Sequence, residues 1–178
     1  MRLGLGVGVN TSSRPLGGFS LTDVSNLKVW LKNDTGLDVS AGAVAQWDDQ
    51  SGNNNHAVQS TSTRQPLYNG GDVHFDGVND AMLLTTNIRA THFGIFAVIE
   101  LDNTSNETLL GNNVDNSEFL RRDGVSWRIR TEGAAHQVAT AGSIGTGTKH
   151  LFVWYTKPNE GGIDYVLREN ASQTGLAT

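Results

Sequence analysis

Two short stretches of the chain are rich in side chains whose oxygen atoms could bind a metal ion. Residues 46–55 and 75–80 contain Asp48, Asp49, Asn53, Asn55, Asp76, Asn79 and Asp80. Carboxylate and amide oxygens are the ligands that Ca²⁺ prefers. If a metal binds, we therefore expect Asp49, Asp76 and Asp80 to be its ligands. The alternative is that these residues form Asx turns, in which Asp and Asn bond to their own backbone, and the lack of a ligand ladder with fixed spacing favours it.

Three arginines are predicted to share one face of a hairpin. Asp123-Gly124 separates two alternating runs, and Asp-Gly in that position is a strong hairpin signal. A two-residue loop there would set Leu120 opposite Trp127. The apolar face of the hairpin then holds Leu120, Val125, Trp127 and Ile129, and the other face holds Arg121, Arg128 and Arg130. Arginine suits bidentate recognition of carboxylates, so this face could meet an acidic partner or an anionic glycan. The alternative is a solvated outer face.

These candidate residues lie on or between runs that alternate with period two, the period of a β-strand. The predicted strands are residues 27–32, 44–47, 73–75, 82–85, 93–101, 118–122, 125–131, 149–156 and 163–168. Residues 93–101 are apolar at both parities, which predicts a strand covered on both faces. The last two strands form a hairpin through residues 158–162. No helical period is evident, so an antiparallel two-sheet sandwich is expected.

Composition narrows the classes of function. The chain has 178 residues, 21 glycines, no cysteine and a net charge of −5. Its length fits one domain with a single core. The acidic balance argues against a nucleic-acid partner, which calls for a basic patch. Without cysteine, disulfides and thiolate metal sites are excluded. No apolar run is long enough for a membrane span, and the glycine-interrupted start does not fit a signal peptide.

The first 19 residues alternate glycine with leucine or valine and then become polar. We expect them to be separate from a sandwich domain over residues 20–178. One interpretation is a disordered terminus. The other is an arm that becomes ordered on a neighbouring subunit, with contacts from Arg2, Leu3, Leu5, Val7 and Val9. The glycines do not form a dinucleotide-binding fingerprint, since no strand precedes them and no helix follows.

The segments around Trp47 and Phe75 resemble the concanavalin A-like lectin/glucanase group, and within it the laminin G-like domains. In that group a W-x-D-x-S-G-N-x-N segment precedes an F-D-G-x-x-D segment at about this distance. The matching residues here are Trp47, Asp49, Ser51, Gly52, Asn53, Asn55, Phe75, Asp76, Gly77 and Asp80. The resemblance implies an all-β, two-sheet antiparallel jelly-roll sandwich. It is more specific for the fold than for the function.

The resemblance also suggests activities that the residues support unequally. Some glucanases of the group carry two catalytic carboxylates on one strand, as retaining hydrolysis requires. Here Glu100-Leu101-Asp102 begins such a pattern, but the acid/base carboxylate that should follow Asp102 is absent. We therefore expect no enzyme activity. Lectins of the group combine an aromatic platform with polar loops. Trp30, between two lysines, is the best exposed candidate, and Asp76, Asn79 and Asp80 would complete the site. Trp127 and Trp154 are expected in the core, and the resemblance makes Trp47 a core or turn anchor.

The arm, the segment GFSLTDVSNLKVWLK and the segment QWDDQSGNNNHAVQ together resemble small structural proteins of tailed bacteriophages. This implies a non-enzymatic virion protein, such as a capsid decoration protein or another head or tail component. Its expected partners are the major capsid protein or tail subunits and further copies of itself. The chain ends soon after the last predicted hairpin, and an open sheet edge would favour assembly. The alternative is a carbohydrate-binding module, with or without Ca²⁺, used for adhesion to host or environmental glycans.

Overall fold

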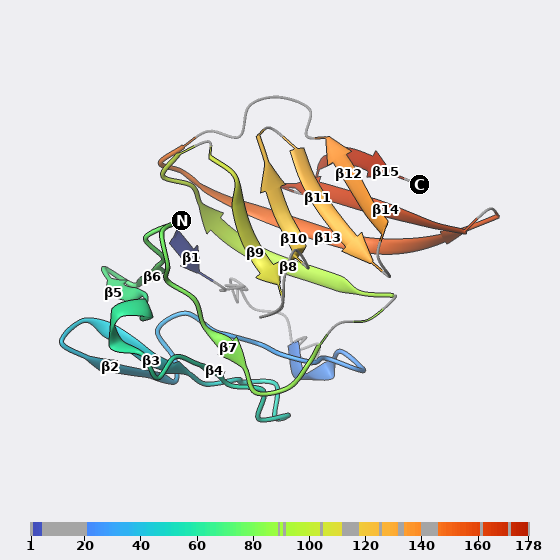
Figure 1. Cartoon of the computed structure of the whole chain (residues 1–178). Helices are drawn as coiled ribbons and strands as arrows, with labels where there is room; N and C mark the ends of the chain where they lie inside the picture. Colours follow the sequence, from blue (N-terminus) through green and yellow to red (C-terminus); the bar gives the residue numbers. More distant parts are fainter. Residues whose placement is uncertain are drawn as a thin grey trace, which may run out of the picture. The chain divides into compact units, whose positions relative to one another are not determined.

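The computed structural model describes residues 2–4, 21–88, 90, 92–103, 105–111, 118–124, 126–131, 134–139, 146–160, 162–170 and 172–177. Within these ranges the regular elements are strands and two single-turn 3₁₀ helices, so the prediction of an all-β protein is confirmed. Among the same residues there is no helix with the length and apolar character needed to cross a membrane. The chain divides into two compact units, Arg2–Ile88 and Arg89–Thr178, here called the N-terminal and C-terminal units (Figure 1).

The N-terminal unit is built from short strands. They are β1 (Arg2–Gly4), β2 (Leu37–Ser40), β3 (Ala43–Trp47), β4 (Ala57–Val58), β5 (Leu67–Asn69), β6 (Asp72–His74) and β7 (Leu83–Leu84), with 3₁₀ helices η1 (Leu21–Asp23) and η2 (Ser62–Arg64). Within this unit the strand order is β1-β6-β5-β3-β4-β7, and β2 also pairs with β3. All these pairs are antiparallel.

The register divides the side chains of this sheet between two faces. Leu37 lies opposite Trp47, which lies opposite Ala57, and these residues contribute to a buried core with Val44 and Val73. The neighbouring positions face the other way, because adjacent residues of a strand point to opposite sides. The sheet therefore buries its Trp47 face, and on the opposite face the side chains of Asp38 and Leu83 are exposed.

The prediction of a strand over residues 27–32 is wrong. Only Leu31 forms a bridge, to Asp49. The backbone groups that a strand ladder would use are instead bonded to a loop. The Asn53 amide donates to the Leu27 carbonyl at 2.6 Å, and the Asn55 amide donates to the Lys28 carbonyl at 2.6 Å. Side-chain amides from the 46–55 stretch have thus replaced the partner strand.

The C-terminal unit contains two four-stranded antiparallel sheets. One has the order β12-β11-β10-β9, made of β9 (Glu107–Gly111), β10 (Glu118–Asp123), β11 (Ser126–Thr131) and β12 (Ala134–Ala139). The other contains β8 (Gly94–Glu100), β13 (Lys149–Asn159), β14 (Gly162–Glu169) and β15 (Ser172–Ala177), in the order β15-β14-β13-β8. Figure 1 shows the strands of each sheet side by side.

Aromatic rings join the two sheets of this unit. Trp127 on β11 meets Trp154 on β13 edge to face, with ring centroids 4.8 Å apart. Phe152 packs against both rings at 5.4 Å. All three side chains are fully buried. The prediction that Trp127 and Trp154 belong to the core is confirmed, and Trp47 is buried in the core of the N-terminal unit.

The two predicted hairpins exist, but their turns differ from the prediction. Asp123 pairs with Ser126, so Leu120 lies opposite Ile129 instead of Trp127. The partner moves by two residues, so the predicted faces are unchanged: Leu120, Trp127 and Ile129 are buried. In the last hairpin Asn159 pairs with Gly162, so the loop has two residues instead of five.

The prediction that residues 93–101 are covered on both faces is wrong. Ala97, Ile99 and Leu101 are buried, whereas Phe96 is 58% exposed. The alternation follows from strand geometry, since Phe96 points to the side opposite its neighbours in sequence. Apolar residues at both parities of β8 thus did not produce burial on both sides.

Candidate functional site

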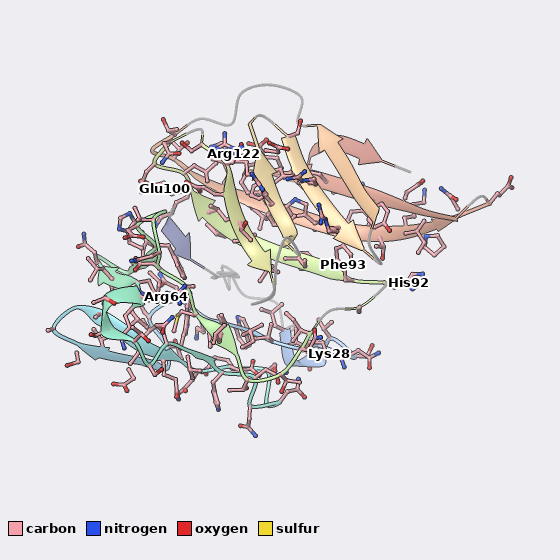
Figure 2. All side chains as sticks on the ribbon, in the orientation of Figure 1. Lys28, Arg64, His92, Phe93, Glu100 and Arg122 are labelled. Carbon is pink, nitrogen blue, oxygen red and sulfur yellow. The ribbon has the colours of Figure 1, made fainter. Side chains whose placement is uncertain are left out.

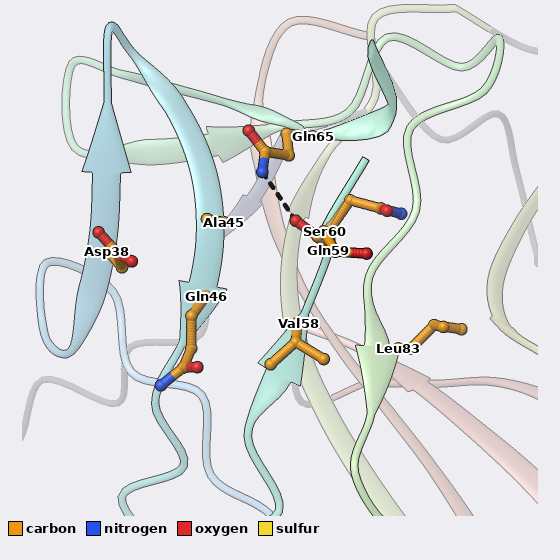
Figure 3. Close-up of a pocket in the computed structure, with 8 residues that line it drawn as sticks. All are labelled: Asp38, Ala45, Gln46, Val58, Gln59, Ser60, Gln65 and Leu83. Carbon is orange, nitrogen blue, oxygen red and sulfur yellow. Dashed lines mark hydrogen bonds between the residues drawn. The ribbon is translucent and has the colours of Figure 1, made fainter. Parts of the chain in front are cut away.

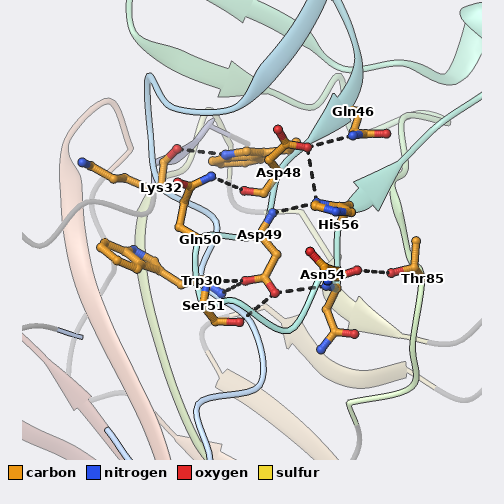
Figure 4. A network of polar contacts seen from close by, with 12 residues as sticks. Trp30, Lys32, Gln46, Asp48, Asp49, Gln50, Ser51, Asn54, His56 and Thr85 are labelled. Atoms are coloured by element: carbon orange, nitrogen blue, oxygen red, sulfur yellow. Dashed lines mark hydrogen bonds and ion pairs between the residues drawn. The ribbon is translucent and has the colours of Figure 1, made fainter. Parts of the chain in front are cut away.

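Asp49 is the centre of a polar network in the N-terminal unit (Figure 4). Its side chain is almost buried and accepts four hydrogen bonds. Oδ1 accepts from the backbone N–H of Trp30 at 2.8 Å and of Ser51 at 2.9 Å. Oδ2 accepts from the Ser51 hydroxyl at 2.7 Å and from the Asn55 backbone N–H at 3.0 Å. Asp49 therefore joins residue 30 to the 51–55 loop.

The charge state of Asp49 follows from these contacts. Burial raises the pKa of its carboxyl, but the hydrogen bonds from Trp30, Ser51 and Asn55 outweigh burial, so the net pKa is below the ordinary 3.8. The group is an anion at neutral pH. Since both oxygens are already bonded to two donors each, metal binding here would compete with the bonds that shape the loop.

Asp48 and His56 extend the network on the other side of Asp49. The Asp48 carboxylate accepts from the Gln46 amide at 2.7 Å and lies 3.3 Å from Nδ1 of His56. The same Nδ1 is 3.2 Å from the Asp49 backbone N–H. One ring nitrogen cannot donate to Asp48 and accept from Asp49. Nδ1 can therefore make only one of these two contacts at a time.

The Asp76–Asp80 turn is closed by its own carboxylates. Oδ1 of Asp76 accepts from the backbone N–H groups of Val78, Asn79 and Asp80 at 2.8, 3.1 and 3.2 Å. Oδ2 of Asp80 accepts from the Asp76 N–H at 2.9 Å. Hydrogen bonds from Val78 and Asn79 lower the pKa of the exposed Asp76 carboxyl. This is the geometry of an Asx turn, the alternative that the sequence left open.

The structure does not gather the three predicted metal ligands into a cluster of acidic and imidazole groups. Within the described ranges, no group of three or more His, Cys, Asp or Glu residues is arranged to hold a metal ion. Asp76 and Asp80 share one turn, whereas Asp49 is committed to Trp30, Ser51 and Asn55. Metal binding by these three residues stays a prediction.

Trp30, the predicted sugar platform, is half-buried. Its backbone N–H is held by Asp49, and its carbonyl accepts from the Gln50 N–H at 2.8 Å. The ammonium group of Lys32 lies 5.9 Å from the centre of the indole ring, which is within the range of a cation–π contact. A sugar on that face would have to displace the lysine. Glycan binding by Trp30, Asp76, Asn79 and Asp80 stays a prediction.

The predicted partner-binding residues lie in both units. Arg121 and Arg128 are directly opposite each other on β10 and β11, and Arg130 lies on the same face of β11. All three are half-buried, and Arg128 is 3.8 Å from the Asp123 carboxylate. In the predicted arm, Arg2 and Leu3 belong to β1, whose partners in β6 are His74 and Val73. Leu5, Val7 and Val9 lie outside the described residues.

Sequence reasoning missed Arg122, which is only 1% exposed on β10 (labelled in Figure 2). Its Nε donates to the Gly124 carbonyl at 3.0 Å, and its Nη1 donates to the Asn103 carbonyl at 2.9 Å. Burial lowers the pKa of the guanidinium, and the nearby Glu107 carboxylate opposes that effect. Period two was the available signal, because it places Arg122 on the same face as the buried Leu120.

A hydroxyl, an imidazole and a carboxylate form a chain at one end of the C-terminal unit, which sequence reasoning also missed. Oγ1 of Thr148 is 2.8 Å from Nε2 of His150, and Nδ1 of His150 is 2.6 Å from Oε1 of Glu169. This order of groups occurs in nucleophilic hydrolases. Here His150 stacks on the buried Phe152, with ring centroids 6.0 Å apart. Because His150 also contacts the core, we interpret the His150–Glu169 pair as a structural link between β13 and β14.

Taken together, the polar side chains that the sequence singled out mainly bond to backbone groups of their own unit. Such bonds build loops and stiffen them, and they leave few polar atoms of these residues available to an external ligand. Comparison of the chain with protein-family models, with curated proteins and with solved structures found no match.

Proposed function

We propose that this protein is a non-enzymatic structural protein of a bacteriophage virion, exposed on the surface of the head or tail. In this proposal residues 20–178 form a concanavalin A-like jelly-roll sandwich, and residues 1–19 dock the protein on a neighbour. The main support is the use of Asp49 and Asp76: their carboxylates bond backbone N–H groups. Carboxylates bonded in this way make a loop rigid, and they are less available to take part in a reaction.

The pattern Glu100-Leu101-Asp102 agrees with the absence of enzyme activity in this proposal. Glu100 ends β8, the side chain of Leu101 is buried, and Asp102 follows in a bend. Retaining hydrolysis of glycosides needs two carboxyl groups about 5 Å apart across the scissile bond. The glutamate that should follow Asp102 by two or three residues is lacking, because Asn103, Thr104 and Ser105 follow instead.

The pairing of β1 suggests how the arm would act. It is a three-residue strand that adds to the edge of β6 through Arg2 and Leu3. Exchange of an identical element between subunits is a low-cost route to assembly, because the same contacts form in both states. In the proposed virion protein, β1 would pair with β6 of a neighbouring copy or with an equivalent edge of a capsid or tail subunit.

Light scattering of the purified full chain over a concentration series tests the proposal. We expect a defined oligomer, or a mass that grows with concentration. The combined variant Leu5→Asp, Val7→Asp and Val9→Asp should reduce that mass to the monomer while its circular dichroism spectrum stays unchanged. A wild-type chain that remains monomeric at every concentration would contradict docking through the arm.

A further inference from the structure

A hollow in the N-terminal unit has an acidic side chain at one end and aliphatic side chains at the other (Figure 3). Its volume is about 310 Å³, and its lining residues are Asp38, Ala45, Gln46, Val58, Gln59, Ser60, Gln65 and Leu83. We propose that this hollow binds a linear alkyl cation, which is the chemistry of a lysine or arginine side chain and of a free alkylamine. The inference does not depend on the proposed virion role, since proteins of many kinds could use such a site.

The register of the sheet sets the order of the groups along the floor of the hollow. Asp38 on β2 lies opposite Gln46 on β3, and Gln46 lies opposite Val58 on β4. Val58 in turn lies opposite Leu83 on β7. Neighbouring strands are about 4.8 Å apart, so Asp38 is about 10 Å from Val58 and about 14 Å from Leu83 along this row. A ligand that uses both ends of the row must be long and narrow.

Asp38 gives the hollow its charge. Among the described residues that line the hollow it is the one ionisable side chain, and it is exposed. A second carboxylate lies beside the lining, because the Gln46 amide donates to Asp48 at 2.7 Å. The guanidinium of Arg64 does not line the hollow, and its Nε donates to the Asn79 carbonyl at 3.4 Å. The local charge is therefore negative, which attracts a cation and repels an anion.

The uncharged polar groups of the hollow can act as donors and as acceptors. The side-chain nitrogens of Gln46 and Gln65 each donate one hydrogen bond within the protein. Each of these amides keeps a second N–H and an oxygen, and the Ser60 hydroxyl has both a proton and lone pairs. These groups adapt to many ligands, so they do not select the charge of the ligand. That selection comes from Asp38.

The aliphatic end of the row selects among cations. Val58 is half-buried, Leu83 is 50% exposed, and Ala45 completes the apolar lining. The described lining residues include no aromatic ring, so they do not form the cage that suits quaternary ammonium ions. A metal ion would find one carboxylate and would gain nothing from aliphatic carbon. A cationic head at Asp38 with a chain of about six carbons reaches the aliphatic end of strands spaced about 4.8 Å apart.

Gln59 makes one wall of the hollow rigid. Its backbone N–H donates to the Ala45 carbonyl at 2.8 Å, and its side-chain oxygen accepts from the Thr61 N–H at 3.0 Å. Its side-chain amide donates to the Ala81 carbonyl at 2.5 Å, and its own carbonyl accepts from the Gln65 amide at 2.7 Å. A wall that is ordered before binding lowers the entropy cost of binding a ligand.

Titration of the full chain with simple ligands tests the selection by charge. The probes are hexylammonium, hexylguanidinium, hexanol and hexanoate, which share one chain and differ in the head group. Amide shifts in nuclear magnetic resonance spectra follow binding, and the largest shifts should lie at residues 38, 45–46, 58–60, 65 and 83. We expect both cations to bind with dissociation constants of about 1–10 mM. Hexanol should bind about threefold more weakly, since an exposed ion pair contributes little, and hexanoate should not bind.

Two variants separate the two ends of the row. Asp38→Asn should weaken hexylammonium binding about threefold and leave hexanol binding unchanged. Leu83→Ala should weaken the binding of both ligands about threefold, because it removes apolar contact. The matched controls are Glu160→Gln, which makes the same change of net charge in the C-terminal unit, and Leu67→Ala on β5. Leu67 and Leu83 are each 50% exposed, but Leu67 does not line the hollow. Neither control should change either affinity.

Capped pentapeptides distinguish a protein side chain from a free amine as the source of the cation. The peptide Gly-Gly-Arg-Gly-Gly is compared with its citrulline counterpart, which is neutral and of the same shape. Binding of the arginine peptide at the same residues would support a partner's side chain as the ligand. Binding of the free alkyl cations without the peptide would support a small-molecule ligand.

The titrations of the wild-type chain keep the test valid if a variant fails to fold. The proposal is overturned if neither alkyl cation shifts the lining amides at about 20 mM, or if hexanol or hexanoate binds as tightly as hexylammonium. Unchanged affinity for hexylammonium in a folded Asp38→Asn variant would overturn it as well.

Discussion

Each of the two units is stabilised internally by a different kind of interaction. The N-terminal unit has strands of at most five residues. The Asp49 carboxylate and the Asn53 and Asn55 amides bond the 46–55 stretch to backbone groups of residues 27–30. The C-terminal unit has strands of up to 11 residues, and rings packed between two sheets join them. One unit is organised by directed hydrogen bonds, the other mainly by buried aromatic surface.

The difference shows what each kind of sequence can build. Short strands offer few ladder hydrogen bonds, so their connecting loops need partners of their own, and Asp and Asn supply these over short distances. Long alternating runs bury apolar surface continuously, so their turns can be brief. We therefore expect the N-terminal unit to respond to changes of polar loop residues and the C-terminal unit to changes of volume.

The largest effect is expected for Trp154→Ala. This side chain is fully buried between Trp127 and Phe152, and truncation of a buried tryptophan costs about 3–5 kcal/mol. Urea unfolding followed by circular dichroism measures the loss. Trp154→Phe is the matched control, because it keeps most of the ring and removes an indole N–H that has no hydrogen-bond partner among the described residues. Equal losses for both variants would contradict a role based on volume.

Asp49→Ala is expected to cost about 3 kcal/mol, since hydrogen bonds to a charged group contribute about 1.5–3 kcal/mol and the change leaves buried donors unpaired. The same urea unfolding experiment applies. Asp38→Asn is the control, because no hydrogen bond to the described residues uses its carboxylate, and the free energy of unfolding should change by less than about 0.5 kcal/mol. A small loss for Asp49→Ala would remove the basis for the polar organisation of the N-terminal unit.

Acid should weaken the hydrogen bonds that the Asp49 and Asp76 carboxylates accept. The pKa values of Asp49 and Asp76 are lowered in the folded chain from the ordinary 3.8, so folding favours their charged forms. Their contribution to stability is complete above the unfolded pKa and is lost as the pH falls through the folded pKa, which lies below 3.8. Melting temperatures between pH 7 and pH 2.5 measure this loss. If Asp49→Asn shows the same steepness below pH 4 as the wild type, Asp49 is not its source.

The smallest effect is expected on β8, where the two opposite faces of one strand can be compared. Phe96→Thr changes a side chain that is 58% exposed, and the free energy of unfolding should change by about 0.5 kcal/mol or less. Ile99→Val, at a fully buried position of the same strand, should cost about 1 kcal/mol. Reversal of this order in chemical denaturation would show that the exposed face of β8 is a packing surface.

Much of the C-terminal unit could be predicted from its sequence. Period two placed Leu120, Trp127 and Ile129 on the buried face and Arg121, Arg128 and Arg130 on the other, because side-chain direction in a strand is a local property. The turn positions were less predictable. Asp-Gly and Asn-x-x-Gly allow more than one register, and local turn preferences do not choose between them.

The candidate sites were less accessible to sequence reasoning. Residue types made Asp49, Asp76 and Asp80 candidate oxygen ligands, but whether a carboxylate faces a metal, a sugar or a backbone N–H depends on distant segments such as residue 30. The row formed by Asp38, Gln46, Val58 and Leu83 was not predicted either, since strand pairing brings these residues together from distant parts of the chain.

The sequence alone therefore determined the all-β class, the inward and outward faces of β10 and β11, and the presence of two hairpins, but not the register of their turns. These follow from steric and hydrogen-bonding preferences that act over a few residues. Only the tertiary structure decided that residues 27–30 bond to a loop, that Arg122 is buried, and that Asp38, Gln46, Val58 and Leu83 form one row. Strand pairing joins distant segments, and its register is selected by the packing of the whole core.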